Sequence, residues 1–219
     1  MEAIERYISD RRLQPGDSLP TESSLCTYLG VSRSSVREAL RQLQALEIVS
    51  VQQGRGAFVG DMSLRPLVKS LLLRNSISPD SVEALRQVVA VRRILDLGIG
   101  TELVSLLAGT HHATLHELVD RMEAKAAQKE WFTEEDVAFH TTLLGLTDNV
   151  LAEQLSEAMW LLHMRAVNSV TRSVEGLLST AQAHRKMLVA AENGDINAYA
   201  SAVVEHYEPI EQVLTSAQN

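Results

Sequence analysis

Four side chains in the second half of the sequence have the residue types and spacings of a divalent-metal site. In DVAFH, Asp136 and His140 are four residues apart and therefore leave the same face of a predicted helix. His184 lies ten residues before the turn Gly194-Asp195, and His206 lies eleven after it. At a rise of about 1.5 Å per residue, both histidines are about 15 Å from that turn, level on antiparallel helices. One carboxylate and three imidazoles can close a site for Zn²⁺, with Ni²⁺ or Mn²⁺ as alternatives.

Each of these residue patterns also has a structural alternative. The stretch 133–136, TEED, is a capping-box pattern that would occupy Asp136, and His140 would then be a half-buried histidine. A competing pair, His112 and His116, follows a loop and lacks partners at matching depth, so we predict a solvated helix start there. His163 is predicted to be a core residue or to line a pocket of the same helical region.

Three arginines form a second pattern, in VSRSSVREALRQLQ (31–44). Arg33, Arg37 and Arg41 are spaced by four residues, on the helix face opposite the apolar positions. Arg55 follows at the tip of a predicted hairpin, before Gly56. Such a stripe on an isolated helix is simply solvated. On the second helix of a helix-turn-helix it favours DNA recognition, because arginine forks match guanine or phosphate oxygens in the major groove.

The charge distribution supports two domains with different roles. Residues 1–60 carry seven Arg and seven Asp or Glu, whereas residues 61–219 carry 13 Lys or Arg against 21 Asp or Glu, which is the whole net charge of −8. The first segment can approach a polyanion that repels the second. We therefore predict a DNA-binding domain at 1–60, a linker at 61–63, and an effector, metal-binding and dimerisation domain at 64–219.

The predicted fold is mostly α-helical. In the first domain, three short helices precede strands at 48–51 and 57–59, with Gly30 as a C-cap and Ser32 as an N-cap, which describes a winged helix-turn-helix. The second domain is predicted to be an all-α bundle of six or seven helices. Its helices are expected at 64–74, 82–108, 115–130, 134–146, 151–170, 174–193 and 196–216.

Composition excludes several classes of protein. No run of about 18 apolar residues is present, so we expect no membrane span, and the first residues lack the apolar run of a signal peptide. The single cysteine, Cys26, excludes an intrachain disulfide and a multi-cysteine zinc site. We expect a soluble cytoplasmic protein.

The first domain strongly resembles the DNA-binding domain of GntR-family bacterial transcription regulators. The resemblance rests on GDSLPTESSL, GVSRSSVREALRQL and GRGAFV, and covers nearly all of residues 4–60. It implies contacts with double-stranded operator DNA from the recognition helix and the wing: Arg33, Ser34, Ser35, Arg37, Arg41, Arg55 and Gly56. Cys26 stands where the family usually has Ala, and Glu47 where it usually has Gly; we expect Glu47 to point to water.

The second domain resembles the FCD sensor of the FadR-type branch of that family. The matching pieces are VRRILD (91–96), DVAFH with Asn149 nine residues on, and HRKMLVAAENGD followed by a histidine, within roughly 85–208. The resemblance implies the metal ligands Asp136, His140, His184 and His206. It also implies a small carboxylate effector beside Arg92, for which an interhelical salt bridge is the alternative role, and we add His163 to that pocket. Ala90 and Asp96 depart from the family's usual Glu.

Together these patterns predict a homodimeric transcription regulator, a repressor rather than an enzyme. Each winged domain would read half of a palindromic operator, since protein and site share a two-fold axis. A direct metal sensor and a regulator with a purely structural metal are the nearest alternatives. A metalloenzyme is the rival class, but it would leave the arginine stripe without a role, and no general base is apparent beyond Glu134 and Glu135 on other faces.

Overall fold

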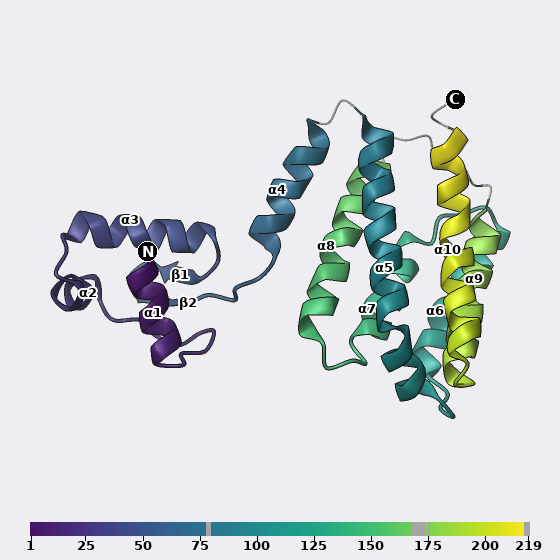
Figure 1. Ribbon diagram of the computed structural model, residues 1–219, viewed down its shortest axis with the longest axis horizontal. Helices are drawn as coiled ribbons and strands as arrows, with labels where there is room; N and C mark the ends of the chain where they lie inside the picture. Colours follow the sequence, from purple (N-terminus) through teal and green to yellow (C-terminus); the bar gives the residue numbers. More distant parts are fainter. Residues whose placement is uncertain (78–79, 168–173, 175, 217–219) are drawn as a thin grey trace. The chain divides into compact units, whose positions relative to one another are not determined.

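The computed structural model describes residues 1–77, 80–167, 174 and 176–216 of the chain (Figure 1). Within these ranges the chain forms ten helices and one two-stranded antiparallel sheet. Its residues fall into two compact units, Met1–Leu67 and Val68–Asn219. The fold is the predicted one, a winged helix-turn-helix followed by an all-helical bundle.

The first unit is built by short amphipathic helices whose ends are set by capping residues. It contains α1 (Glu2–Asp10), α2 (Glu22–Leu29), α3 (Arg33–Ala45), β1 (Val49–Gln52) and β2 (Gly56–Val59). Gly30 ends α2 at φ 65°, a left-handed conformation that glycine adopts without steric cost. Ser32 begins α3 and accepts a hydrogen bond from the backbone N–H of Ser35, as predicted.

A small apolar core holds the helices of this unit against the hairpin. Residues from all three helices and both strands contribute to it, including Ile4, Leu25, Leu43 and Val59. The strands pair Val49 with Val59, which leaves the turn between them as the wing. The face of α3 that carries the arginines lies opposite this core.

Glu47 does not point to water, and that expectation was wrong. Its φ is +57°, which turns the chain sharply before β1. Its carboxylate then accepts hydrogen bonds from Ser63 Oγ at 2.5 Å and from Arg65 Nε at 2.9 Å. These bonds hold the pKa of Glu47 below its ordinary value, with the Ser63 hydrogen bond as the largest cause. Glu47 therefore ties the turn before the wing to the start of the next helix.

The remaining helices match the predicted ones to within three residues at each described end. They are α4 (Arg65–Ser76), α5 (Ser81–Leu107), α6 (Ala113–Ala127), α7 (Thr133–Leu144), α8 (Val150–Val167), α9 (Leu177–Glu192) and α10 (Ile196–Ser216). Residues 78–79 of the predicted break, 168–170 of the predicted 151–170 helix and residue 175 lie outside the described residues. None of the helices in the described ranges is long and apolar enough to cross a membrane.

The core of the helical unit lies among α5, α6, α7, α9 and α10. A second apolar cluster joins α4 to α5 and α8, through residues such as Val68, Val88 and Leu162. In Figure 1, α5 runs along the bundle beside α8 and α10, in agreement with the contacts between these helices. The helices that carry the four candidate metal ligands are thus packed around one core.

Two fully buried tyrosines on α10 differ in the hydrogen bonding of their hydroxyl groups. Tyr207 Oη donates a 2.6 Å hydrogen bond to the buried carboxylate of Asp96 on α5. The hydroxyl of Tyr199 is buried and has no hydrogen-bond partner among the residues that the structure describes. Burial raises the pKa of both hydroxyl groups, so both stay protonated.

We expect Tyr207→Phe and Tyr199→Phe to change stability in opposite directions. The first removes a hydrogen bond to a carboxylate and should lower the free energy of unfolding by about 1.5–3 kcal/mol. The second removes an unpaired polar group from the core and should leave the free energy of unfolding equal or higher. Urea unfolding followed by the fluorescence of Trp131 and Trp160, both in the helical unit, measures the two variants side by side. Equal destabilisation of both would contradict this account.

Candidate metal centre and nucleic-acid surface

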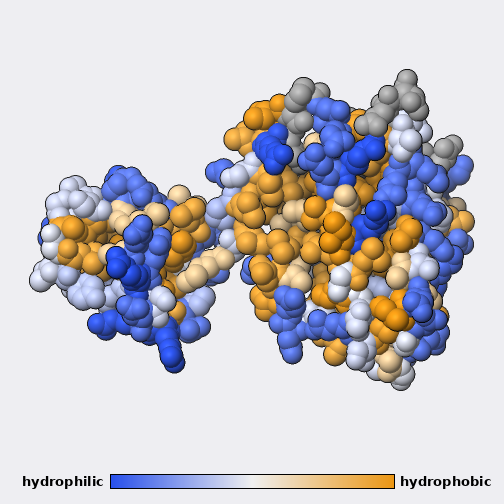
Figure 2. All heavy atoms as spheres, in the orientation of Figure 1, coloured by the Kyte–Doolittle hydropathy of each residue, from blue (hydrophilic) through white to orange (hydrophobic). Residues whose placement is uncertain are grey.

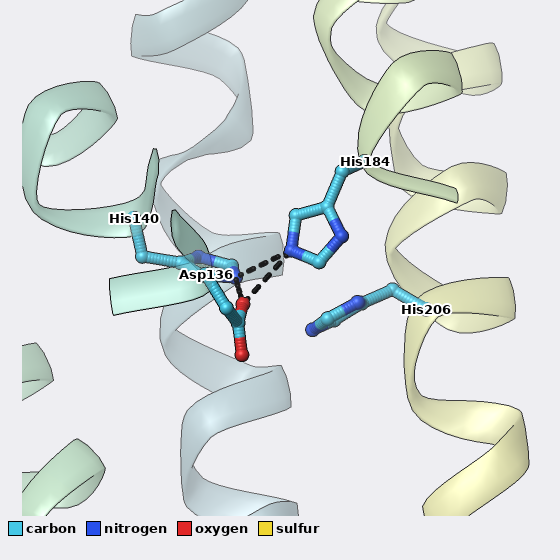
Figure 3. Close-up of side chains that lie close together, drawn as sticks. All are labelled: Asp136, His140, His184 and His206. Atoms are coloured by element: carbon cyan, nitrogen blue, oxygen red, sulfur yellow. Dashed lines mark hydrogen bonds and ion pairs between the residues drawn. The ribbon is translucent and has the colours of Figure 1, made fainter. Parts of the chain in front are cut away.

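Four side chains from three helices converge in the interior of the helical unit. Figure 3 shows Asp136 and His140 of α7, His184 of α9 and His206 of α10 pointing toward one another. One potential ligand atom from each residue lies within 4.8 Å of the other three, and all four residues are buried. The rings of His184 and His206 lie 4.3 Å apart, so the two histidines are level on their antiparallel helices.

The distances within the cluster suit one small cation. His184 Nε2 is 2.9 Å from Asp136 Oδ1 and 3.3 Å from His140 Nε2, and His140 Nε2 is 3.4 Å from the same carboxylate oxygen. Ligands placed about 2.0–2.1 Å from a tetrahedral Zn²⁺ are about 3.3 Å from each other. The spacing of Asp136, His140 and His184 therefore fits a divalent metal, and His206 completes the donor set within 4.8 Å.

Local contacts orient the imidazoles for this role. His184 Nδ1 donates to the carbonyl oxygen of Thr180 at 2.9 Å, which leaves Nε2 facing the cluster. His140 Nδ1 lies 3.8 Å from the carboxylate of Asp96, on the side away from Asp136. Metal-bound histidines in proteins are commonly held by such carbonyl and carboxylate groups. The edge of the Phe139 ring packs against both imidazoles.

The electrostatics of the cluster favour the metal-binding forms of Asp136 and His206. Burial alone would raise the pKa of Asp136, but hydrogen bonds from His140 and His184 and their positive charge hold it well below its ordinary value. Burial also lowers the pKa of His206 well below that of free histidine, and the neighbouring histidines add to this shift. Asp136 is thus ionised and His206 neutral, the forms that bind metal.

The capping alternative for Asp136 is not what the structure shows. Phe132 is the N-cap of α7 and makes no side-chain capping bond. The carboxylate of Asp136 instead faces the histidines, one turn into the helix. Asn149, by contrast, acts as a cap: its side-chain oxygen accepts a hydrogen bond from the backbone N–H of Ala152.

A buried arginine and an aromatic pair lie beside the cluster. Arg92 of α5 is 6% exposed, and its guanidinium lies 4.3 Å from the ring centre of Trp160 and 5.7 Å from that of Tyr207. Among the described residues, no carboxylate lies within 4.0 Å of this guanidinium, so the salt bridge that was the alternative role for Arg92 is absent there. The next residue, Arg93, does form one, at 2.7 Å from Glu211. Within the described part of the chain, Arg92 is therefore a buried cation that faces aromatic rings and no carboxylate.

His163 stacks on Trp160, the ring that Arg92 also contacts. The two rings are nearly parallel, with centres 5.3 Å apart, and the buried Nδ1 atom of His163 has no hydrogen-bond partner in the described ranges. Burial lowers the pKa of His163 to about 3, and the charge of Arg92 adds to the shift. His163 is therefore neutral and offers an unused polar atom. The sequence predicted that Arg92 and His163 share a pocket, and both contact Trp160, which the sequence analysis did not single out.

The competing histidines lie at a helix start, as predicted, because His112 is the N-cap of α6 and His111 is exposed. The expectation that they lack partners was wrong. His116 Nε2 donates to Glu192 at 2.8 Å, and Arg185 donates to His116 Nδ1 at 3.2 Å. His111 stacks on His116, so that His111, His116 and Glu192 form a second group of potential ligands. Because Arg185 brings a positive charge and fixes the tautomer with Nε2 protonated, this group is suited to an ion-pair network rather than to a metal.

The residues predicted to contact DNA are all exposed in the first unit. Six polar or basic side chains and one glycine make up this set: Arg33, Ser34, Ser35, Arg37, Arg41, Arg55 and Gly56. The arginines of α3 lie on one face of that helix, and Arg55 lies at the tip of the wing, before Gly56 at φ +111°. Ser34 and Ser35 also bond to the capping hydroxyl of Ser32.

Comparisons with known proteins agree with the division of the chain into a DNA-binding unit and a helical unit. Residues 1–59 match the family described as "Bacterial regulatory proteins, gntR family", and residues 87–209 match the FCD domain. The HTH-type transcriptional regulator LutR of Bacillus subtilis is 26% identical over 95% of this chain and 96% of its own length. The galactonate operon transcriptional repressor of Escherichia coli is 26% identical over 92% of this chain and 89% of its own. A solved structure, "Streptococcus agalactiae GntR", shares the fold with a TM-score of 0.66 at 23% identity, covering 96% of this chain and 97% of that one.

The two histidine clusters make different predictions for metal content. We expect about one Zn²⁺, Ni²⁺ or Mn²⁺ per purified chain, and little in a His184→Ala, His206→Ala double variant. A His111→Ala, His116→Ala double variant is the matched control and should keep its metal. Elemental analysis by mass spectrometry gives the content, and circular dichroism checks that each variant is folded. Bound metal should decrease as the pH falls, because protons compete for the imidazoles. Equal metal in the first variant and the wild type would rule out the site.

Proposed function

The chain belongs to the GntR family of bacterial regulatory proteins and carries an FCD domain, and from that premise we propose how this transcription regulator is controlled. We propose that it is a homodimeric repressor of the FadR-type branch. Its first unit would bind operator DNA, and its helical unit would bind a metal and a small carboxylate effector. Effector binding would lower the affinity for the operator.

The proposed binding of a carboxylate effector rests on the buried arginine, Arg92, beside the metal cluster. A buried cation without a carboxylate partner is costly unless an anion neutralises it. Arg92 can supply a planar fork of donors to a carboxylate, and the unused Nδ1 of His163 can take a second polar group. One relative is named for a galactonate operon, and galactonate is itself a small carboxylate.

The metal is proposed to be a resident ion of this pocket, held by Asp136 and the three histidines. When bound, it would supply a positive charge to an anionic ligand, and a metal with octahedral coordination would also offer it open positions. We favour Zn²⁺, with Ni²⁺ and Mn²⁺ as alternatives. The chain's own residues orient the ligand, since Arg92 and the ring of Trp160 form one wall beside the cluster.

Two exposed regions support the proposed partners. The arginines of α3 and the wing form the surface that we propose for the major groove and its phosphates. On α5, Val91 is 42% exposed and Ile94 is 67% exposed. Figure 2 shows apolar side chains gathered on the visible face of the helical unit. Covering such a face with a second copy would produce the two-fold symmetry that a palindromic operator requires.

Regulation would follow from unequal affinity of the effector for two states of the dimer. A ligand can shift such an equilibrium only by as much as its affinities for the two states differ. We propose that, when the helical units bind the effector, the distance between the two winged units no longer matches the spacing of the two half-sites. The operator would then be released when the effector is present.

We expect Arg33→Ala and Arg37→Ala each to weaken operator binding by about 1–3 kcal/mol, which is roughly 5- to 150-fold. Fluorescence anisotropy with a duplex carrying the upstream region of the regulated genes measures this. Binding should weaken steeply with added salt, because cations are released from the phosphates. Arg6→Ala, which removes one charge from an exposed position on α1, is the control and should have a small effect. If the wild type failed to bind, or if neither α3 variant differed from it, the DNA-binding surface would be wrong.

Adjacent arginines on α5 allow a controlled test of the effector site. Small organic acids, galactonate among them, are screened for an increase in melting temperature. At a hundredfold excess over Kd, we expect about 2.7 kcal/mol of stabilisation, or roughly 5–10 °C. Arg92→Lys should abolish this increase, whereas Arg93→Lys should keep it, because Arg93 is occupied by Glu211.

Repeating the melting-temperature screen with a chelator distinguishes the proposed function from a direct metal sensor and from a purely structural metal. Removal of the metal should reduce the response to the acid if the ion helps to hold the ligand. Stabilisation by metal with no response to any acid would instead favour a direct metal sensor or a purely structural ion. An identical acid response in the Arg92→Lys variant would contradict the proposed pocket.

A further inference from the structure

The first turn of α2 contacts two of the arginines that we propose for DNA recognition. Arg37 Nε donates a 2.8 Å hydrogen bond to Glu22 Oε2, and Arg33 Nη2 donates to Ser23 Oγ at 3.1 Å. Glu22 and Ser23 lie on α2, whereas the arginines lie on α3, so these contacts join the two helices of the helix-turn-helix. The contact between Glu22 and Arg37 places a carboxylate on the surface that would face DNA.

The stability of the fold does not explain this carboxylate. The side chains of Arg37 and Glu22 are 57% and 38% exposed, and an ion pair so exposed adds little to stability. Next to DNA, a negative charge is repelled by every phosphate, whatever the sequence. Glu22 lies in the first turn of α2, where a carboxylate also favours the helix N-terminus. On the proposed DNA surface its charge would weaken binding to any sequence, so a benefit to recognition would have to lie in discrimination between sequences.

The geometry of the guanidinium shows how that benefit can arise. Arginine has five N–H donors in a rigid plane, and Glu22 takes the one on Nε. The four donors on Nη1 and Nη2 remain free to form the fork that matches O6 and N7 of guanine. Fixing the plane in advance also reduces the side-chain freedom that would be lost on binding. The carboxylate further disfavours a rotation of Arg37 toward a phosphate.

We infer that Glu22 is a positioning residue for sequence recognition, which holds Arg37 for one guanine and lowers the affinity for DNA of other sequences. This inference rests on the proposed DNA binding through Arg37. It assigns a role to a residue of α2 that does not itself need to contact a base. The role has two separable parts, the hydrogen bond to Nε and the negative charge.

The test uses full-length protein and a duplex selected by the wild type from a pool with a randomised centre. Anisotropy then gives Kd for the selected duplex, for each single base-pair change and for a scrambled duplex. In Glu22→Ala, the preference for guanine at one position should fall at least about fivefold, while binding to the scrambled duplex tightens. Glu22→Gln keeps an acceptor for Nε without the charge, and should keep most of the preference while also binding the scrambled duplex more tightly.

Two further variants make the result specific to Arg37. Glu38→Gln removes the same charge from α3, where Glu38 lies 3.9 Å from Arg41, and should tighten binding without loss of preference. In an Arg37→Ala background, Glu22→Ala should no longer change the preference at that base pair. Melting temperatures should be equal for Glu22→Ala and the wild type.

Three outcomes would overturn the inference. These are an unchanged preference in Glu22→Ala, an equal loss of affinity for all duplexes, and an effect that persists without Arg37. If Arg37→Ala removed the preference and Glu22→Ala did not, the inference alone would fail. If the wild type selected no sequence from the pool, the proposed function and the inference would fail together.

Discussion

The helical unit depends on the burial of one carboxylate, that of Asp136. An ionised carboxylate in a protein interior is strongly unfavourable unless charges and hydrogen-bond donors surround it. Here the donors are His140, from the same helix, and His184, from α9. The imidazole of His206 closes the group from α10. Three helices must therefore keep their depth and rotation relative to one another, and a divalent cation at the centre would satisfy the same carboxylate in place of protons.

Spacing along the chain predicted which ligands meet, because depth in a helical hairpin follows from residue counts. His184 and His206 are level for this reason, and Ser32 and Gly30 mark helix ends through local backbone chemistry. Contacts that depend on the rotation of one helix against another could not be predicted from residue counts or capping residues. The bond from Tyr207 to Asp96 and the stacking of Arg92 on Trp160 belong to this class.

Two expectations failed for a related reason. Glu47 meets Ser63 and Arg65 because the chain folds back after the hairpin, and local composition could not show that return. His116 is paired by Glu192 and Arg185, which come from α9, so a survey of its sequence neighbours finds no partner. In both cases the missing information was a long-range contact. The predicted helix ends, which depend on neighbours, were found within a few residues.

The neutrality of His163 has a consequence for the living cell. With a pKa of about 3, this imidazole gains no proton anywhere in the range of internal acidity that bacteria survive. The wall formed by Arg92 and Trp160 therefore keeps the same formal charge during acid stress. In the proposed effector site, acidity would therefore act on the metal ligands, where protons compete with the ion, and not on this wall.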